Sequence, residues 1–324
     1  MERPEFAWDR GIHLVGSVLW FDASRPDVLT FLSSARVRDA GRHAVALCTD
    51  RTRDLVRVVR KDFAPLVAPF GKVLHLGPLD ITMHPSGHMP GAAIVRVATH
   101  GTTVLYASQV ALRAHAMAEV AQVPKGDVLV IRADYGHLEQ AFPERADALA
   151  RVVDVARRTL AGGNTPVFLG SLMGKSQEVV RALTKAGVPV LVHRSIAAVN
   201  QQYRVMGFDP GAARQFRGAP RHDHALVLPE VLRFKRTVTG LERVRLVWLS
   251  GRSLMPDVLA RMRVDEGIPL TGHLDPAGLL ALVEKTGVTR VIAVGHGAEA
   301  VAGRIRARGV EAVAMQSEVQ LLMF

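Results

Sequence analysis

Strand-like and helical segments alternate through the second half of the chain, and this alternation constrains the fold more than any other feature. Apolar runs typical of buried strands lie at residues 165–169 and 188–193, with a helical pattern at 175–186 between them. Because a strand, a helix and a second strand in this order form a crossover, the two strands are expected to be parallel in one sheet. Further strands are expected at 244–249 and 288–294, and further helices at 276–286 and 298–308. The sequence therefore predicts an α/β fold.

The first half of the chain has a different character, with short apolar runs separated by turns. Strands are expected at residues 11–21, 43–48, 72–76, 79–84, 92–99, 102–108 and 127–131. The pair His100-Gly101 predicts a tight hairpin turn between two of them. Helices are expected at residues 49–60 and 143–162, and the polar stretch 209–224 is expected to be a loop. A β-rich beginning followed by a βαβ insert is the predicted organisation.

Composition narrows the class of protein. Hydrophobic residues make up 48% of the 324 and charged residues 22%, as in folded globular proteins. The single cysteine, Cys48, excludes a disulfide framework and a multi-cysteine zinc site. No apolar run is long enough to span a bilayer, and the N-terminus has no apolar signal-peptide core, so we expect no membrane partner and a cytoplasmic location.

The net charge is the first indication of function. Lysine and arginine outnumber aspartate and glutamate by 41 to 30, which gives a formal charge of +11. Such a surplus favours an anionic partner, and nucleic acid is the commonest one. The alternative source is a GC-rich genome, which favours arginine codons. The basic residues are spread along the chain, so the fold has to assemble any basic surface.

The segment Gly174-Lys175-Ser176 lies between a predicted strand and a predicted helix, where a phosphate-binding P-loop would be expected. That motif requires four residues between its glycines, whereas Gly170 and Gly174 are separated by three. The loop geometry that surrounds a phosphate depends on this spacing, so an NTPase is not predicted.

Three of the thirteen histidines lie beside glycines at the ends of predicted elements. These are His88 in Ser-Gly-His-Met-Pro-Gly, His273 in Thr-Gly-His-Leu-Asp, and His296 in Val-Gly-His-Gly. A lone histidine is more often a hydrogen-bonded structural residue than a ligand. The carboxyl end of a strand, however, is where α/β proteins build their sites, so these three are candidates for functional residues.

The sequence resembles the metallo-β-lactamase-fold nucleases that carry a β-CASP insert, and among them is most similar to the bacterial ligase-associated DNA exonucleases, which are related to RNA 3′-end processing exonucleases. Seven segments in the family's order carry the resemblance: Trp20-Phe21-Asp22, residues 85–92 (Pro-Ser-Gly-His-Met-Pro-Gly-Ala), residues 102–108, residues 174–178 (Gly-Lys-Ser-Gln-Glu), residues 191–197, residues 272–275 (Gly-His-Leu-Asp) and residues 295–297 (Gly-His-Gly). The fourth of these also accounts for the P-loop-like glycines.

The resemblance implies a metallo-β-lactamase αββα sandwich with an inserted β-CASP domain. We place the two parts of the lactamase domain at residues 1–155 and 241–316. The β-CASP insert is expected at 156–240 and a C-terminal tail at 317–324. In such proteins the substrate lies between the lactamase and β-CASP domains, so the resemblance implies a binding cleft there.

The sequence departs from the family at its metal ligands. The central signature, Ser/Thr-His-x-His-x-Asp-His, corresponds to residues 33–39, where Ser34, Arg36, Arg38 and Asp39 replace the four ligands. The bridging aspartate corresponds to Gln109, and a following acidic residue corresponds to Arg132. Of the seven expected ligands only His88 and His296 remain, together with His273, which the family uses outside the metal shell.

These replacements disfavour a two-metal centre. A guanidinium group stays protonated and has no lone pair for a metal. At about 4 Å and an effective dielectric near 20, each unit-charge repulsion costs about 4 kcal/mol, and a divalent ion doubles it. Two histidines alone do not complete a zinc site. We therefore expect no metal cofactor; the alternative is a rearranged zinc or manganese site built from His88, His296, Asp39 and Asp134.

The predicted function is that of a catalytically inactive nuclease homologue, a nucleic-acid-binding or scaffolding subunit with DNA favoured and DNA repair as the context. Candidate contacts are Arg36, Arg38, Arg132, Lys175 and Arg194; salt-bridged filling of the former pocket is the alternative role for each. Two other functions stay open. One is an active exonuclease or phosphodiesterase with the rearranged metal site. The other is an interaction module for an active nuclease paralogue or for a repair ligase or helicase.

The last five residues, Gln320-Leu321-Leu322-Met323-Phe324, are similar to the pentapeptide that binds the bacterial sliding clamp, Gln-Leu-x-Leu-Phe, with Met323 in place of the second leucine. Such a peptide places leucine and phenylalanine in an apolar pocket while glutamine bonds at its rim. The DNA sliding clamp is therefore an expected partner. The alternative is a terminal segment that packs on the core.

Overall fold

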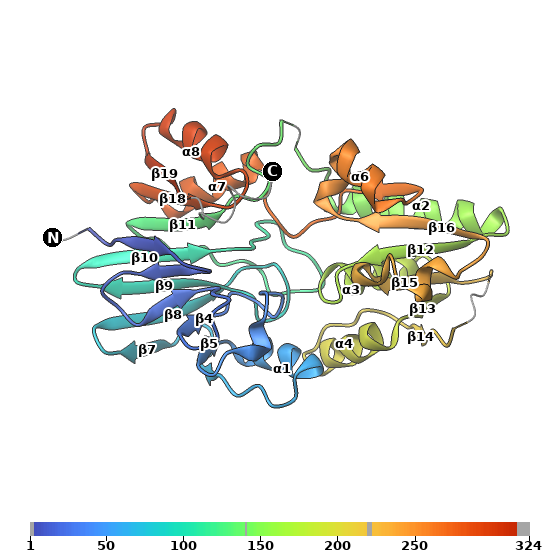
Figure 1. Cartoon of the computed structure of the whole chain (residues 1–324), viewed down its shortest axis with the longest axis horizontal. Helices are drawn as coiled ribbons and strands as arrows, with labels where there is room; N and C mark the ends of the chain where they lie inside the picture. Colours follow the sequence, from blue (N-terminus) through green and yellow to red (C-terminus); the bar gives the residue numbers. More distant parts are fainter. Residues whose placement is uncertain (1–2, 140, 219–221, 316–324) are drawn as a thin grey trace. The chain divides into compact units, whose positions relative to one another are not determined.

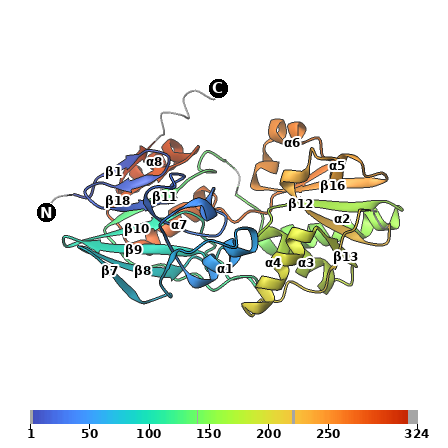
Figure 2. The ribbon, with the colours of Figure 1, turned by 60° about the horizontal axis from the view of Figure 1, so that its bottom comes forward.

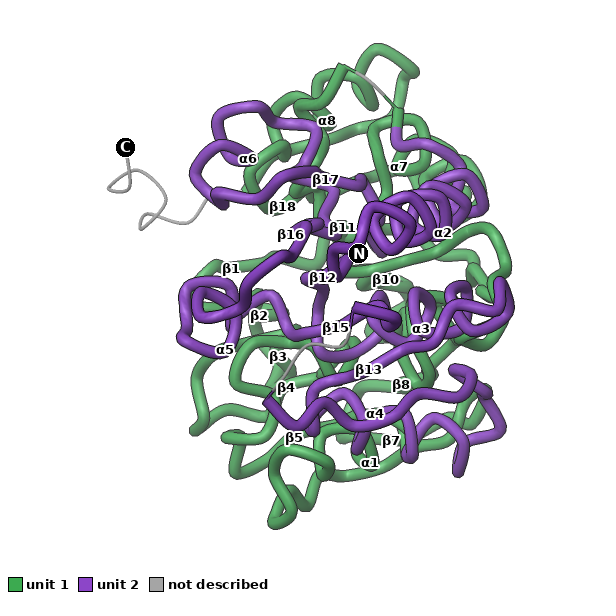
Figure 3. The backbone as a smooth tube through the Cα atoms, turned by 90° about the vertical axis from the view of Figure 1, so that its right-hand side faces the viewer, with its two compact units in different colours: residues 1–141, 273–324 green, residues 142–272 purple. Residues whose placement is uncertain are grey.

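A computed structural model describes residues 3–139, 141–218 and 222–315, and the chain divides into two compact units. Unit 1 contains Met1–Ala141 and His273–Phe324, and unit 2 contains Phe142–Gly272 (Figure 3). Unit 2 is thus an insertion between two parts of unit 1. Within the described residues no helix has the length and apolar character to cross a membrane.

Unit 1 is built on two sheets (Figure 1). In the described part of the chain the first sheet has six strands in sequence order: β1 (Phe6–Trp8), β2 (Ile12–Leu14), β3 (Leu19–Phe21), β4 (Leu29–Phe31), β5 (Ala46–Cys48) and β6 (Leu66–Val67). The second has seven strands in the order β19 (Glu311–Met315), β18 (Arg290–Val294), β11 (Val128–Arg132), β10 (Thr102–Ala107), β9 (Ala93–Thr99), β8 (Leu79–Pro85) and β7 (Val73–Leu76).

The seven-stranded sheet is buried on both faces, which explains why β11 and β18 read as continuous apolar runs. Val128 and Val130 of β11 point to a core that also contains Phe21 and Phe31 of the six-stranded sheet. Their neighbours along β11 belong to the opposite cluster, which includes side chains of α7 (Pro276–Thr286) and α8 (Ala298–Arg306). This alternation follows from the two-residue period of a strand.

The outer face of the six-stranded sheet is covered by α1 (Asp50–Val59). Val56 of this helix shares a buried cluster with Ala46 and Cys48 of β5. Thr49 caps the helix, because its hydroxyl accepts a hydrogen bond from the Thr52 amide at 3.1 Å. The expected helix at residues 49–60 is therefore confirmed, with its first residue acting as the cap.

Unit 2 contains a six-stranded sheet among the described residues, in the order β14 (Arg214–Gln215), β13 (Val190–Val192), β15 (Ala225–Pro229), β12 (Thr165–Gly170), β16 (Val244–Leu249) and β17 (Glu266–Ile268). All of its pairs are parallel. This confirms the parallel sheet that the strand–helix–strand alternation predicts, although β15 lies between β12 and β13.

Helices cover both faces of the unit 2 sheet (Figure 2). Side chains of α2 (Arg145–Ala161), α3 (Lys175–Lys185) and α4 (Arg194–Val205) share one apolar cluster with the strands. Side chains of α5 (Arg236–Thr239) and α6 (Pro256–Met262) belong to the cluster on the other face. The chain is accordingly a mixed α/β protein with several sheets.

Unit 2 extends beyond residues 156–240 at both ends. It begins before α2 because Ala148, Val152 and Val155 of that helix are buried against its sheet. It continues to residue 272 because β16 pairs with β12 and β17 pairs with β16. Two further points concern local structure: residues 194–205 form a helix, α4, that is not among the predicted helices, and the predicted loop 209–224 contains the short strand β14.

Candidate functional site

Among the described residues, strands β8, β10, β11, β18 and β19 of the seven-stranded sheet end at the same edge. Strands β10, β11 and β18 are parallel to one another, and β8 has the same direction because both β8 and β10 are antiparallel to β9. The loops that follow these four strands contain His88, Gln109, Asp134 and His296. We call this edge the carboxyl edge of unit 1; in α/β folds it is the usual location of a site.

Asp22 links the six-stranded sheet to this edge. Its carboxylate accepts hydrogen bonds from the amide and the hydroxyl of Ser33, at 2.7 and 2.6 Å, and from the Tyr106 hydroxyl at 2.8 Å. The Ser33 carbonyl in turn accepts a bond from the Ala93 amide at the start of β9. Burial raises the pKa of the Asp22 carboxyl, while the bonds from Ser33 and Tyr106 act in the opposite direction.

Arg132 lies at the end of β11, and its charge reaches this cluster. Its Nε donates a hydrogen bond to the Asp134 carboxylate at 2.8 Å. Burial acts against the guanidinium charge, but the carboxylate of Asp134, together with Tyr106 and Asp22, raises the pKa of Arg132 above its ordinary value. The side chain keeps 44% of its surface exposed. The Arg132 guanidinium is therefore a fixed and accessible cation at the carboxyl edge. It stands where the nucleases that the sequence resembles have an acidic residue.

His273 connects Asp134 to Gln109. Gln109 Nε2 donates to His273 Nε2 at 3.0 Å, which places the ring proton on Nδ1, 3.7 Å from the Asp134 carboxylate. The ring of Tyr135 contacts the imidazole edge-on, with centroids 5.4 Å apart. Gly295 leaves room for Asp134, since a Cβ atom there would lie 2.6 Å from Asp134 Oδ1. The network holds the His273 ring between an amide and a carboxylate.

The two retained ligand-type histidines differ in their surroundings. His296 is exposed, and its ring packs edge-on against His137 with centroids 4.9 Å apart. Burial, and then the nearby His296, lower the pKa of His137. His88 is only 3% exposed, in the loop between β8 and β9. Gly87 in that loop has φ +76°, and a Cβ atom there would lie 2.4 Å from the Ala111 carbonyl oxygen.

The segment that replaces the family's central signature is basic and partly exposed. The Arg36 amide donates to the Ser34 hydroxyl at 3.3 Å, while Arg38 has 91% of its side chain exposed. The Asp39 carboxylate lies 3.7 Å from Arg38 and 3.3 Å from Arg42. This acidic side chain is therefore neutralised by two arginines.

The described residues do not fit a zinc or manganese site. No group of three or more His, Cys, Asp or Glu side chains in residues 3–139, 141–218 and 222–315 is arranged to hold a metal ion. Asp134 is engaged by Arg132, and Asp39 by Arg38 and Arg42. A divalent ion bound to either carboxylate would lie next to a guanidinium charge. No step of a metal-dependent reaction can be derived from these residues.

The two candidate contacts of unit 2 have different positions. Lys175 is 7% exposed and its Nζ donates to the Leu249 carbonyl at 2.6 Å, so its ammonium group holds β16 to the start of α3. Arg194 is exposed on the first turn of α4. Lys175 thus has a structural role through a bond to a backbone carbonyl, whereas Arg194 is placed where a ligand could reach it.

Two of the ionic contacts that the sequence did not predict concern residues near the candidate site or its family motifs. Arg145 donates to both oxygens of Glu178, at 2.8 and 2.7 Å, and to the Thr271 carbonyl at 2.9 Å. Arg132 and Asp134 form the other. The second could have been found, because residues two apart in an extended chain lie on the same side. The first joins segments far apart in sequence and has no local signal.

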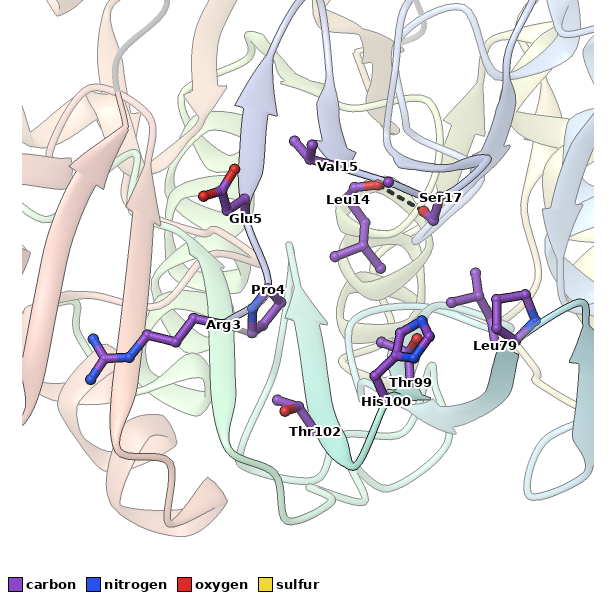
Figure 4. A pocket seen from close by; sticks show the side chains of 12 residues that line it. Arg3, Pro4, Glu5, Leu14, Val15, Ser17, Leu79, Thr99, His100 and Thr102 are labelled. Carbon is purple, nitrogen blue, oxygen red and sulfur yellow. Dashed lines mark hydrogen bonds between the residues drawn. The ribbon is translucent and has the colours of Figure 1, made fainter. Parts of the chain in front are cut away.

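A separate cavity of about 520 Å³ lies at the opposite edge of the seven-stranded sheet. Leu14 and Leu79 contribute apolar surface to it, and Ser17, Thr99 and Thr102 contribute hydroxyls (Figure 4). These residues lie at the β7–β8 and β9–β10 turns and on the β2–β3 connection. None of the predicted site residues lines it. The predicted clamp-binding residues Gln320, Leu321, Met323 and Phe324 lie outside the described residues.

Comparison with known proteins gives distant relatives. The chain is 29% identical over 323 residues to a probable DNA ligase of Opitutus terrae, covering 97% of this chain and 32% of that protein. It is 27% identical to the transcription termination factor FttA of Methanococcus maripaludis over 42% of this chain, and 23% identical to RNase aCSPSF2 of Saccharolobus solfataricus over 38%. The chain spans about a third or less of the length of these relatives. No family model matches.

A solved structure supports the overall arrangement of elements. A protein of unknown function from Enterococcus faecalis V583 superposes with a TM-score of 0.52 at 12% identity. The match covers 82% of this chain and 74% of that protein. At this identity the likeness concerns the fold alone.

Proposed function

We propose that unit 1 is a metallo-β-lactamase αββα sandwich and that unit 2 is its β-CASP insert. The buried clusters of unit 1 support this assignment, since they join α1 to the six-stranded sheet, that sheet to the seven-stranded one, and the latter to α7 and α8. The position of unit 2 between two parts of unit 1 agrees with an inserted domain. The distant similarity to RNase aCSPSF2 and FttA points in the same direction.

The chain acts in this proposal as a catalytically inactive nuclease homologue that binds nucleic acid, with DNA favoured. A single observation carries it: Arg132 presents a fixed guanidinium at the carboxyl edge, on the strand end where the resemblance expects a metal-binding acid. The similarity to a probable DNA ligase over nearly the whole chain favours DNA and a repair-related scaffold.

The chemistry of such a site is phosphate binding. Arginine presents its N–H groups in a planar fork that matches phosphate oxygens, and its charge does not depend on pH in the physiological range. Arg38 is almost fully exposed and Arg132 is held by Asp134, so one cation is adaptable and the other is preorganised. With Arg36 these residues give the former metal position the charge that suits a sugar–phosphate backbone.

The direct test measures DNA binding of the full chain by fluorescence anisotropy at several salt concentrations. We expect the affinity to fall steeply with salt, since each phosphate contact releases counterions. The variant Arg36→Glu with Arg38→Glu should bind at least tenfold more weakly at low salt. Arg308→Glu is the matched control, because Arg308 is exposed after α8, at the opposite edge of the sheet. Equal affinity of the double variant and the wild type at low salt would refute the proposal.

A further inference from the structure

The segment that follows β15 in unit 2 exposes large apolar side chains. Val231, in the short 3₁₀ turn Glu230–Leu232, is 77% exposed, and Phe234 is 60% exposed. Single exposed apolar residues are ordinary, but a phenylalanine exposed this far is not a core residue and contributes little to folding. Phe234 lies beyond the carboxyl end of β15, at the edge of the parallel sheet where ligands of α/β proteins bind.

The neighbouring Arg233 holds the Phe234 ring in place. The guanidinium of Arg233 lies 5.1 Å from the centroid of the Phe234 ring, a cation–π distance. Arg233 itself is 7% exposed and donates to the carbonyls of Met262 and Arg263 at the end of α6. These bonds fix the arginine, and the arginine supports the ring, so the aromatic surface is presented on a rigid base.

The ring is followed directly by two cations. Lys235 and Arg236 are both exposed, and neither forms a salt bridge with a carboxylate of residues 3–139, 141–218 and 222–315. The acidic groups nearby are already engaged: Glu230 accepts a bond from the Trp248 indole at 2.9 Å, and Asp265 from the Leu246 amide at 2.6 Å. The segment therefore combines an exposed aromatic ring with two exposed cations that pair with no carboxylate of the described residues.

We propose that Phe234, Lys235 and Arg236 form a binding surface for single-stranded nucleic acid, with a base stacked on the ring and phosphates on the two cations. We call it the Phe234 surface. Proteins bind single strands by this combination of aromatic stacking and backbone-tracking charge, and duplexes cannot use it because their bases are already stacked. The inference rests on the proposed function and deepens it, since it specifies the form of nucleic acid that unit 2 accepts.

The test compares a single-stranded deoxythymidine 20-mer with a duplex of the same length, using the full chain at low salt. Phe234→Ala should weaken binding of the single strand about tenfold, within the range for loss of one stacked base, and should leave duplex binding unchanged. Phe234→Trp should bind the single strand like the wild type. The fluorescence of the new indole should fall when the single strand is added. Val205→Ala is the control, because Val205 is 70% exposed elsewhere in unit 2 and should have no effect.

The outcomes separate this inference from the proposed function. If the wild type binds DNA and the Arg36→Glu, Arg38→Glu variant does not, while Phe234→Ala binds the single strand like the wild type, the Phe234 surface is refuted and the proposed function stands. Equal weakening of both DNA forms by Phe234→Ala also refutes the single-strand assignment. If Phe234→Ala leaves DNA binding intact but abolishes association with a protein partner, the surface binds protein instead. Absence of any DNA binding by the wild type refutes both proposals.

Discussion

Arg132 and Asp134 form an ion pair two residues apart in the chain, with the guanidinium Nε donating to the carboxylate at 2.8 Å. Arg132 is the last residue of β11 and Asp134 lies in the turn that follows, so the pair is formed by neighbours in the chain. It holds the guanidinium at the carboxyl edge of unit 1. The same contact occupies the carboxylate that a rearranged metal site would need.

Removing the Arg132 guanidinium should weaken the part of DNA binding that does not depend on the base sequence. For Arg132→Ala we expect weaker binding to all sequences alike and a salt slope smaller by about 1, as for the loss of one phosphate contact. Arg132→Lys keeps the charge and should retain most of the slope. Anisotropy titrations over a salt series measure both quantities, and an unchanged slope for Arg132→Ala would show that Arg132 does not contact phosphate.

The purified protein should contain no stoichiometric zinc or manganese and should not degrade DNA or RNA. The physical reason is the guanidinium charge beside Asp39 and Asp134, together with the burial of His88. Elemental analysis by mass spectrometry gives the metal content, and labelled substrates with added Zn²⁺ or Mn²⁺ give the activity. One metal per chain, with nuclease activity that His88→Ala abolishes, would establish the rearranged metal site.

The pair formed by Arg145 and Glu178 should stabilise unit 2. Glu178 has only 5% of its side chain exposed and accepts both bonds from Arg145, so Glu178→Ala leaves a mostly buried guanidinium without its carboxylate. We expect a loss of about 3 kcal/mol in the free energy of unfolding, as for other broken buried pairs. Asp154→Ala, which removes the exposed pair of Asp154 and Arg158, is the control and should cost less than about 0.5 kcal/mol. Denaturant titration compares them.

Cys48 should be unreactive in the folded protein. Burial raises the pKa of its thiol to about 12, so the thiolate is scarce at any pH where the fold is stable. Because the unfolded thiol titrates near its ordinary value, the unfolded chain releases this proton first as the pH rises. The contribution of Cys48 to stability is therefore constant below about pH 8 and declines above pH 9. Thiol labelling should be as slow as global unfolding. Cys48→Ala should remove the part of the alkaline loss of stability that comes from this thiol. Rapid labelling of the folded protein would contradict the burial of Cys48 and its raised pKa.

The C-terminal residues 320–324 remain a candidate for clamp binding. A peptide this short has few anchors and must be ordered on binding, so micromolar affinity is expected for the clamp. Contact of the rest of the protein with DNA would add avidity. Calorimetry of the intact protein and of a chain lacking residues 321–324 tests this prediction. Heat of binding that persists in the shortened chain would assign the contact to another surface.

The sequence predicts the strands of this protein better than its long-range contacts. The apolar run at residues 127–131 corresponds to β11, because a strand buried on both faces leaves a continuous apolar pattern. The hairpin at His100-Gly101 is confirmed as well, with φ of 48° and 76° at the two positions. Residues 194–205 were missed as a helix because the histidine that caps it, His193, is not a usual capping residue.

For the candidate site, the sequence predicts which residues are basic but not which of them are exposed to a ligand. Arg38 and Lys175 are both basic residues at positions matched to the family, yet one is 91% exposed and the other is bonded to the Leu249 carbonyl. The difference arises from β16, a strand more than sixty residues after Lys175, which brings an acceptor to its ammonium group. No local pattern contains that information.

The pairing of β11 with β18 has a consequence for the order in which the protein folds. Val128 lies opposite Arg290, so the whole of unit 2 must be accommodated within the loop that this pairing closes. The entropy lost on closing a loop grows with its flexible length, and a folded unit 2, with Arg145 bonded to the Thr271 carbonyl, shortens that length greatly. During synthesis the edge of β11 that pairs with β18 therefore keeps its backbone N–H and C=O groups unpaired until β18 has emerged. This interval is when the nascent chain has most need of a chaperone.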